Sequence, residues 1–377
     1  MASTVFFHVG LPKTGTTYLQ TLLWNNEDEL RRQGVLLPGE SVREHLWASG
    51  VVREDPKIDR RGPLAAGAWD RIVADVNDWP GTAIVSHEFF ASASAEQAVR
   101  AMERLQGAEV HVVVTARDTL SLVTARWQEF VKNGSTVGID DYPVREDTSP
   151  EQEWDWGTLD LADVLHRWGA SLPPERVHIL SLPKPGTPRD ELWVRFARLV
   201  GIDHAACDPS GSVQNESLGV VEVELLRRVN AELVDFTAAI DRGNWIRGYL
   251  AQGKLVPRRG EKFWPSPERI EELRDRGDRA VDFVVGQGYD VIGDVEDLRT
   301  PKEVPERRHP DSVTDTEIAE AAAATIAAMM TDVRRLTRER RAAREELEEA
   351  RSALELRSPV GFTRKVQRRV RRMWSRS

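Results

Sequence analysis

Cysteine is nearly absent from this chain: Cys207 is the only one in 377 residues. One thiol excludes an internal disulfide framework and is typical of a reducing compartment. No apolar run approaches the roughly 20 residues that a membrane-spanning helix needs. The first residues, MASTVFFHVG, lack the basic region of a secretory signal. From these absences we expect a cytoplasmic protein.

The composition is otherwise typical of a folded protein, with 40% hydrophobic residues, 30% charged residues and 12 tryptophans. Charge is unevenly distributed. The net charge is −9, yet the last twenty residues contain seven Arg or Lys and no acid, so residues 1–357 carry −16. An acidic body with a basic end bears on partners rather than on fold.

Four short β-branched runs, at 5–9, 83–86, 110–115 and 177–182, read as buried strands with amphipathic helical sequence between them. The first helix is expected from Tyr18 to Gly34. This alternation predicts an α/β fold, a P-loop-type parallel sheet flanked by helices. Residues 133–157 are acidic, aromatic and rich in turn formers, and we expect them to cover the C-terminal edge of the sheet.

The C-terminal third predicts three further parts after a domain at 1–298. Residues 299–312 contain three prolines and predict a linker. Residues 313–357 have neither Pro nor Gly and predict a long charged helix. A seam alternates by four and three along it, through Met329, Val333, Leu336, Arg340, Ala343, Leu347, Ala350 and Leu354. Both a coiled-coil homo-oligomer and a single helix remain open.

The tail, residues 358–377, places Val366, Val370, Met373 and Trp374 on one face of a basic helical pattern. A basic amphipathic helix favours binding to an anionic membrane surface, here peripherally at the inner face of the membrane. Docking on the acidic body, docking on a neighbouring subunit and a disordered tail are the alternatives. We expect no nucleic-acid partner, because the body is acidic.

The stretch FFHVGLPKTGTTYLQ carries the main chemical signal. Gly10 and Gly15 are spaced as in the nucleotide-binding pattern G-x-x-x-x-G-K-[ST], but Thr16 stands where that pattern has lysine. The only lysine, Lys13, lies within the loop. A glycine-flanked turn between a strand and a helix directs backbone N–H groups at one point, and the helix N-terminus adds partial positive charge. The loop therefore predicts an anion site.

Residues 12–17, PKTGTT, match the P-K-[ST]-G-[ST]-[ST] loop of the sulfotransferases, and the chain resembles that family here. The resemblance implies 3′-phosphoadenosine 5′-phosphosulfate as co-substrate, no metal, and a hydroxyl acceptor on a glycan, glycolipid or small metabolite. It implies that Lys13 is catalytic at the bridging oxygen. The phosphosulfate ligands would be Pro12, Lys13, Thr14, Gly15, Thr16 and Thr17. The alternative is a P-loop nucleotide-binding protein of kinase or ATPase type, or a non-catalytic scaffold.

The resemblance also implies a 3′-phosphate site. In the family an Arg ends a strand and a Ser follows about two helical turns later. Arg117 takes the first place, but ARDTLSLVTA lacks the usual Pro and has Ala125 at the eighth position, so Ser121 and Thr124 both remain candidates. A late basic loop closes on this phosphate in the family. Here GKLVPRRGEKFWP offers Arg258 and Arg259, with Lys254 and Lys262 beside them.

Transfer to a hydroxyl needs a base that accepts the acceptor proton. The family uses His or Glu at the end of a strand near the loop, and TAIVSHEFF offers His87 and Glu88. These two side chains point to opposite faces if the strand continues. Glu88 is favoured because it would share a face with Ser86, and both residues remain candidates.

Overall fold

The computed structural model describes residues 2–105, 107–144, 153–184, 186–211 and 217–357. The chain divides into two compact units, residues 1–313 and residues 314–377. The basic tail and the centre of the 133–157 insertion lie outside the described residues.

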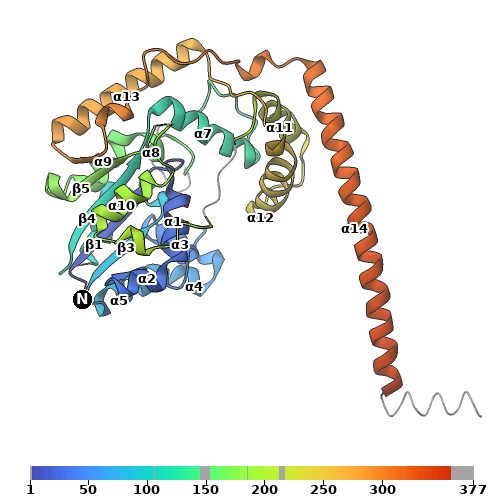
Figure 1. Cartoon of the computed structure of the whole chain (residues 1–377), viewed down its shortest axis with the longest axis horizontal. Helices are drawn as coiled ribbons and strands as arrows, with labels where there is room; N and C mark the ends of the chain where they lie inside the picture. The colour runs from blue at the N-terminus through green and yellow to red at the C-terminus, as the bar shows by residue number, and fades with distance from the viewer. Residues whose placement is uncertain (1, 106, 145–152, 185, 212–216, 358–377) are drawn as a thin grey trace, which may run out of the picture. The chain divides into compact units, whose positions relative to one another are not determined.

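The first unit is built on one sheet of six parallel strands in the order β2-β3-β1-β4-β5-β6 (Figure 1). The α/β prediction is therefore confirmed. Four strands fall on the predicted runs, and β2 and β6 were not predicted because they are only two and three residues long. The strands are β1 (Thr4–Gly10), β2 (Val35–Leu36), β3 (Thr82–Ser86), β4 (Glu109–Ala116), β5 (Val177–Ser181) and β6 (Asp290–Ile292).

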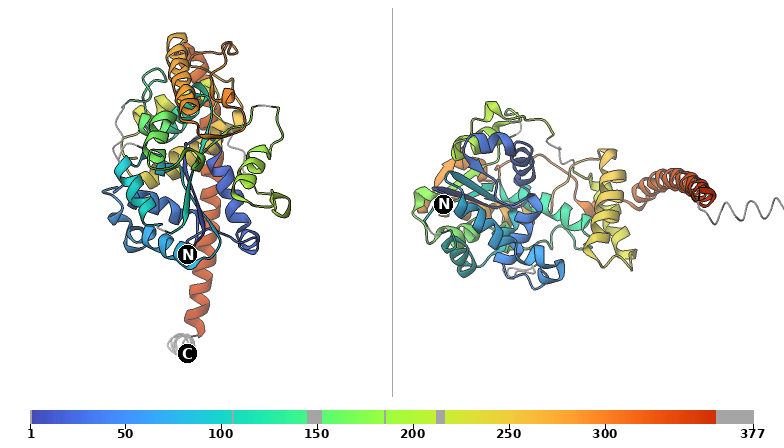
Figure 2. Two further views of the ribbon diagram at one scale, coloured as in Figure 1. Left: turned by 90° about the vertical axis from the view of Figure 1, so that its left-hand side faces the viewer. Right: turned by 90° about the horizontal axis from the view of Figure 1, so that it is seen from below.

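Helices cover both faces of the sheet (Figure 2). Alternate side chains of β1 point to opposite faces, and both sets are buried against these helices. Phe6 belongs to a buried cluster that includes Leu19 of α1 (Thr16–Asn25), Leu30 of α2 (Glu27–Arg32) and Phe196 of α10 (Glu191–Val200). Phe7 faces the other way. Its ring centroid lies 4.8 Å from that of Trp168 in α9 (Leu161–Gly169) and 5.8 Å from that of Trp69 in α5 (Ala68–Asp78).

The helix predicted from Tyr18 to Gly34 is two helices in the structure. Asn26 separates α1 from α2, and its side-chain amide donates hydrogen bonds to the carbonyls of Leu22 and Asp208. The remaining helices of the first unit are α3 (Val42–Val52), α4 (Pro63–Ala66), α6 (Ala95–Glu103), α7 (Thr119–Lys132), α8 (Trp156–Leu159), α11 (Val220–Glu232), α12 (Ala239–Asp241), a π-helix (Arg242–Leu255) and α13 (Pro267–Gln287).

The segment 299–312, expected to be a linker, contacts the rest of the first unit. Arg308 pairs with Phe263 in a parallel β-bridge, and the Trp264 indole N–H donates to the Pro305 carbonyl at 3.1 Å. The Arg307 guanidinium lies 3.9 Å from the centre of the Trp264 ring. Three prolines stiffen this stretch without excluding it from the domain, because an aromatic anchor fixes it in place.

The second unit begins with the predicted long helix, α14 (Asp315–Arg357). Side chains at 333–352 are exposed on every side of this helix. Within the described ranges, no helix is both long enough and apolar enough to cross a bilayer.

Candidate active site

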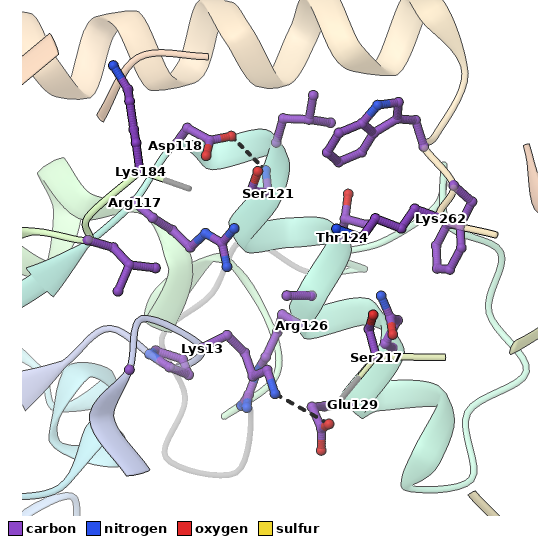
Figure 3. Close-up of a pocket in the computed structure, with 18 of the residues that line it drawn as sticks. Lys13, Arg117, Asp118, Ser121, Thr124, Arg126, Glu129, Lys184, Ser217 and Lys262 are labelled. Carbon is purple, nitrogen blue, oxygen red and sulfur yellow. Dashed lines mark hydrogen bonds and ion pairs between the residues drawn. The ribbon is translucent and has the colours of Figure 1, made fainter. Parts of the chain in front are cut away.

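A cavity of about 650 Å³ opens where the loop after β1 meets the start of α7 (Figure 3). Its size is in the range of sites for small molecules, roughly 300–1,000 Å³. The lining comes from the C-terminal ends of β1 and β4, from one side of α7, and from residues 262–264 and 299–307. Ligands of open parallel sheets bind at this edge.

The predicted anion loop forms one wall of the cavity. Lys13 has φ 65° and Gly15 has φ 88°, so both adopt left-handed backbone conformations. A side chain at position 15 would be strained by this φ, and its Cβ atom would lie 2.5 Å from a methyl carbon of Leu192. The helix α1 begins at Thr16, and no side chain in the described part of the chain caps its N-terminus. The wall contains Pro12, Lys13, Gly15, Thr16 and Thr17.

Thr14, predicted to bind the co-substrate, does not line this cavity. Its side chain is fully buried, and the hydroxyl donates to the Leu11 carbonyl and lies 2.6 Å from the Thr115 hydroxyl of β4. Thr115 in turn donates to the Gly10 carbonyl at 3.0 Å. Thr14 therefore holds the loop in place by joining it to β4 on the side away from the cavity.

Lys13 points its ammonium group at a carboxylate that the sequence did not single out. Its Nζ lies 3.4 Å from an oxygen of Glu129 (Figure 3). The same oxygen lies 3.0 Å from Nζ of Lys132. Burial lowers the pKa of Lys13, and the Glu129 charge opposes that effect. Burial would raise the pKa of Glu129, but the two lysines lower it to about 2. Glu129 is therefore ionised and a weak base.

Arg117 follows β4 and lines the cavity, as predicted. Its Nε is buried and has no hydrogen-bond partner among the described residues. Burial lowers the pKa of this guanidinium, with Asp118 as the nearby opposing charge. Such a group is costly to bury unless an anion pairs with it. The Arg117 side chain lines the same cavity as Lys13 of the loop.

Both candidate hydroxyls, Ser121 and Thr124, also line the cavity from α7. The Thr124 hydroxyl is buried without a partner among the described residues, whereas the Ser121 backbone N–H is held by the N-cap Asp118 at 2.8 Å. The Ser121 hydroxyl also has no hydrogen bond among the described residues, so both hydroxyls can bind a ligand, and Thr124 is the more buried of the two.

The two candidate bases have different positions. The strand β3 ends at Ser86, and a 3-10 turn (Glu88–Ser92) follows with His87 as its N-cap. His87 is buried outside the cavity lining, and its Nδ1 accepts from the Phe89 N–H at 3.1 Å. Glu88 lines the cavity, and Gln20 of α1 donates to its carboxylate at 3.3 Å. Burial would raise the pKa of Glu88, but His87, a backbone hydrogen bond and Arg126 outweigh this effect, so the pKa lies below its usual 4.5.

Of the four basic candidates in the late segment, Lys262 lines the cavity, whereas Lys254, Arg258 and Arg259 do not. Arg258 forms an ion pair with Glu222 at 2.9 Å, and neither Arg258 nor Arg259 lines the cavity. The lining instead includes Lys262, Phe263 and Trp264 from the same segment, and Arg307 from the stretch stacked on Trp264. Arg258 satisfies a buried carboxylate, which explains why it turns away.

Arg126 is a further cation that the sequence analysis missed. Its side chain is 4% exposed, lies 3.9 Å above the Trp154 ring and donates to the Glu153 carbonyl at 2.6 Å. No carboxylate among the described residues forms an ion pair with it. Arg126 thus ties one end of the 133–157 insertion to the cavity. Its helical spacing from Glu129 and Lys132 was a usable signal, since residues three apart share one side of a helix.

Two buried histidines support the loop from behind. His8 in β1 contacts the hydroxyls of Ser86 and Thr115, at 2.8 and 3.2 Å. His45 in α3 accepts from the Ser86 N–H through Nδ1 at 3.1 Å, so its proton lies on Nε2, which faces the Pro38 carbonyl at 2.7 Å. Burial lowers the pKa of both from 6.5 to about 4.

These histidines predict acid sensitivity. A folded-state pKa below the unfolded value means that their contribution is complete above pH 6.5 and is lost as pH falls toward 4. Because the pKa of His45 falls from 6.5 to about 4 on folding, protonation of this residue alone should lower the free energy of unfolding by about 3 kcal/mol at acidic pH. We expect the free energy of unfolding, measured with denaturant at several pH values, to fall over this range.

In His45→Asn the loss between pH 6.5 and pH 4 should be smaller by about one histidine's share. His166→Gln, which changes an exposed histidine, should keep the wild-type slope. An unchanged slope in His45→Asn would contradict the interpretation.

At the level of sequence, no protein-family model and no curated protein matches the chain. Two solved structures are similar to it. A sulfotransferase from Alicyclobacillus acidocaldarius is 15% identical with a TM-score of 0.40, and the match covers 66% of this chain and 96% of that one. The sulfotransferase domain from the curacin biosynthetic pathway is 9% identical with a TM-score of 0.37, covering 77% and 99%. Both TM-scores lie below 0.5, a level that does not establish a shared activity.

Proposed function

We propose that the chain is a sulfotransferase that uses 3′-phosphoadenosine 5′-phosphosulfate and moves its sulfonate to a hydroxyl acceptor. One observation carries the proposal. Lys13, the uncapped N-terminus of α1 and the unpaired Nε of Arg117 meet at a single cavity. That arrangement offers separate ligands for two anionic groups of one molecule, which the phosphosulfate nucleotide has.

The residues present fit the nucleotide. Thr16, Thr17 and the backbone N–H groups at the start of α1 would hold the 5′-phosphate, since a helix N-terminus favours anions. Arg117 would hold the 3′-phosphate through its planar fork, with Thr124 as the adjacent hydroxyl. When bound, the nucleotide supplies a sulfonate on a good leaving group.

Lys13 and Glu88 would do the chemistry on the protein side. Lys13 would stabilise the negative charge that develops on the bridging oxygen when the sulfur–oxygen bond breaks. Glu88 would accept the proton from the acceptor hydroxyl as the new oxygen–sulfur bond forms. His87 is less suited, because its Nδ1 is occupied and its side chain is buried.

Arg117→Ala tests the nucleotide site directly. Wild-type protein should bind adenosine 3′,5′-bisphosphate without magnesium in calorimetric titration. The variant should bind it about 10- to 100-fold more weakly, because hydrogen bonds to a charged group contribute roughly 1.5–3 kcal/mol.

Arg104→Ala removes an exposed arginine that pairs with Asp70, and it should bind like the wild type. If the wild type bound only ATP, and only with magnesium, the loop would serve a nucleoside triphosphate and the proposal would be wrong.

A further inference from the structure

The long helix α14 carries an apolar stripe with heptad spacing. Positions a of the heptad are Ile326, Val333, Arg340 and Leu347, and positions d are Met329, Leu336, Ala343 and Ala350. The side chains of Ile326, Val333, Leu336 and Leu347 are 58%, 54%, 51% and 51% exposed. Half-exposed large apolar side chains in a row mark an interaction surface.

A lone helix of this kind is poorly supported. Within the described part of the second unit, residues 333–352 are exposed on every side, so no packing inside that unit stabilises them. Helices in water owe most of their stability to a packed apolar face. The stripe has the 3.5-residue period of a two-helix seam rather than the wider face of a helix that packs on a globular core.

We propose that the occupant of this stripe is the same helix of a second copy, in parallel and in register. The core residues favour two strands, because Ile326 and Val333 are β-branched at position a and Leu336 stands at d. The flanking charges favour the parallel orientation. Glu339 and Glu346 occupy position g, and Arg344 and Arg351 occupy position e.

In a parallel pair, each g residue faces the e residue five positions later on the other helix. Glu339 therefore meets Arg344 of the second copy, and Glu346 meets Arg351 of the second copy. In an antiparallel pair, g faces g and e faces e, so glutamates would meet glutamates and arginines would meet arginines. Among the described residues of one chain, Glu339 forms an ion pair with exposed Arg335, at 2.9 Å, and that pair can be exchanged at little cost.

Arg340 sets the strength and the register of the pair. A charged residue at position a lowers stability and favours the alignment in which it meets its own copy, where the long stem can carry the charge out to water. Ala343 and Ala350 add little buried area. The contact is therefore concentrated at 326–336 and at Leu347.

Light scattering of the full chain over a concentration series tests the association. The wild type should reach twice the 42.5 kDa chain mass. Val333→Asp with Leu336→Asp should remain at the single-chain mass. The matched control, Arg338→Asp with Ala342→Asp, changes exposed positions outside the stripe and should remain a dimer. A wild type that stays at 42.5 kDa throughout, or that forms trimers, overturns the proposal.

Cysteine pairing tests the orientation, in a chain that carries Cys207→Ser to remove the native buried thiol. In a parallel, in-register pair, Val333→Cys should form a disulfide with its own copy, and so should Leu347→Cys. In an antiparallel pair, position a packs against position d of the other helix. Cross-linking of Val333→Cys with Ala350→Cys when the two variants are mixed, without cross-linking of Val333→Cys to its own copy, would therefore show an antiparallel pair and would overturn the proposal.

Discussion

Replacing Lys13 by alanine is expected to lower kcat for sulfonate transfer by about 10²–10³, the usual cost of removing one preorganised group that stabilises developing charge. Lys13 would act on the bridging oxygen as the sulfur–oxygen bond breaks, so the affinity for the intact phosphosulfate nucleotide, in which that oxygen carries no charge, should change much less than kcat. The measurement is steady-state transfer to an acceptor beside calorimetry with the phosphosulfate nucleotide in the absence of acceptor.

The geometry makes this variant clean to interpret. At φ 65° the backbone strain should be similar for alanine and lysine, because both carry a Cβ atom. Glu129 keeps Lys132 as an ion-pair partner at 3.0 Å when the Lys13 side chain is removed. Lys57→Ala, at an exposed lysine elsewhere, should leave kcat unchanged. Loss of affinity for the intact phosphosulfate nucleotide equal to the loss of kcat would mean that Lys13 only binds the nucleotide and does not assist transfer.

Glu88→Gln is expected to lower kcat by about 10²–10⁴, the range for removal of a general base. The amide keeps the size of the side chain and its position beside Gln20, but it cannot accept a proton. Because the pKa of Glu88 is held below its usual 4.5, wild-type activity should not show the loss of this base between pH 8 and pH 5. The pH–rate profile and kcat of the variant are the measurements.

Two variants separate the possible explanations for that loss. Glu103→Gln, at an exposed carboxylate, should retain wild-type kcat. Glu129→Gln should raise KM for the nucleotide or disturb Lys13 without removing the base, since the Glu129 carboxylate is engaged by the ammonium groups of Lys13 and Lys132. If Glu88→Gln kept wild-type kcat while His87→Asn lost it, the assignment of the base would be reversed.

The sequence was sufficient for features that depend on neighbours along the chain. The β-branched runs predicted four of the six strands, and PKTGTT predicted a loop whose Pro12, Lys13, Gly15 and Thr16 line the cavity. The short edge strands carry too few residues to show a period. The inward turn of Thr14 depends on Thr115, which is 101 positions away.

The remaining differences also depend on distant residues. Glu129 is 116 positions from Lys13 in the chain, and only the packing of α7 beside the loop brings the two together. Arg258 matched a basic pattern, but Glu222 pairs with it and draws it away from the cavity. Long-range pairing of this kind leaves no trace in local spacing.

The stretch 299–307 has a practical consequence for any shortened version of this protein. Three prolines make Leu298 a natural place to end an expression clone, but Arg299, Pro305 and Arg307 are part of the cavity wall. A fragment that ended there would retain the strand, the PKTGTT loop and α7, and Trp264 would lose both the carbonyl and the guanidinium that cover it. Such a fragment would present an open trough with an uncovered indole, and its failure to turn over substrate would say nothing about the chemistry of the intact chain.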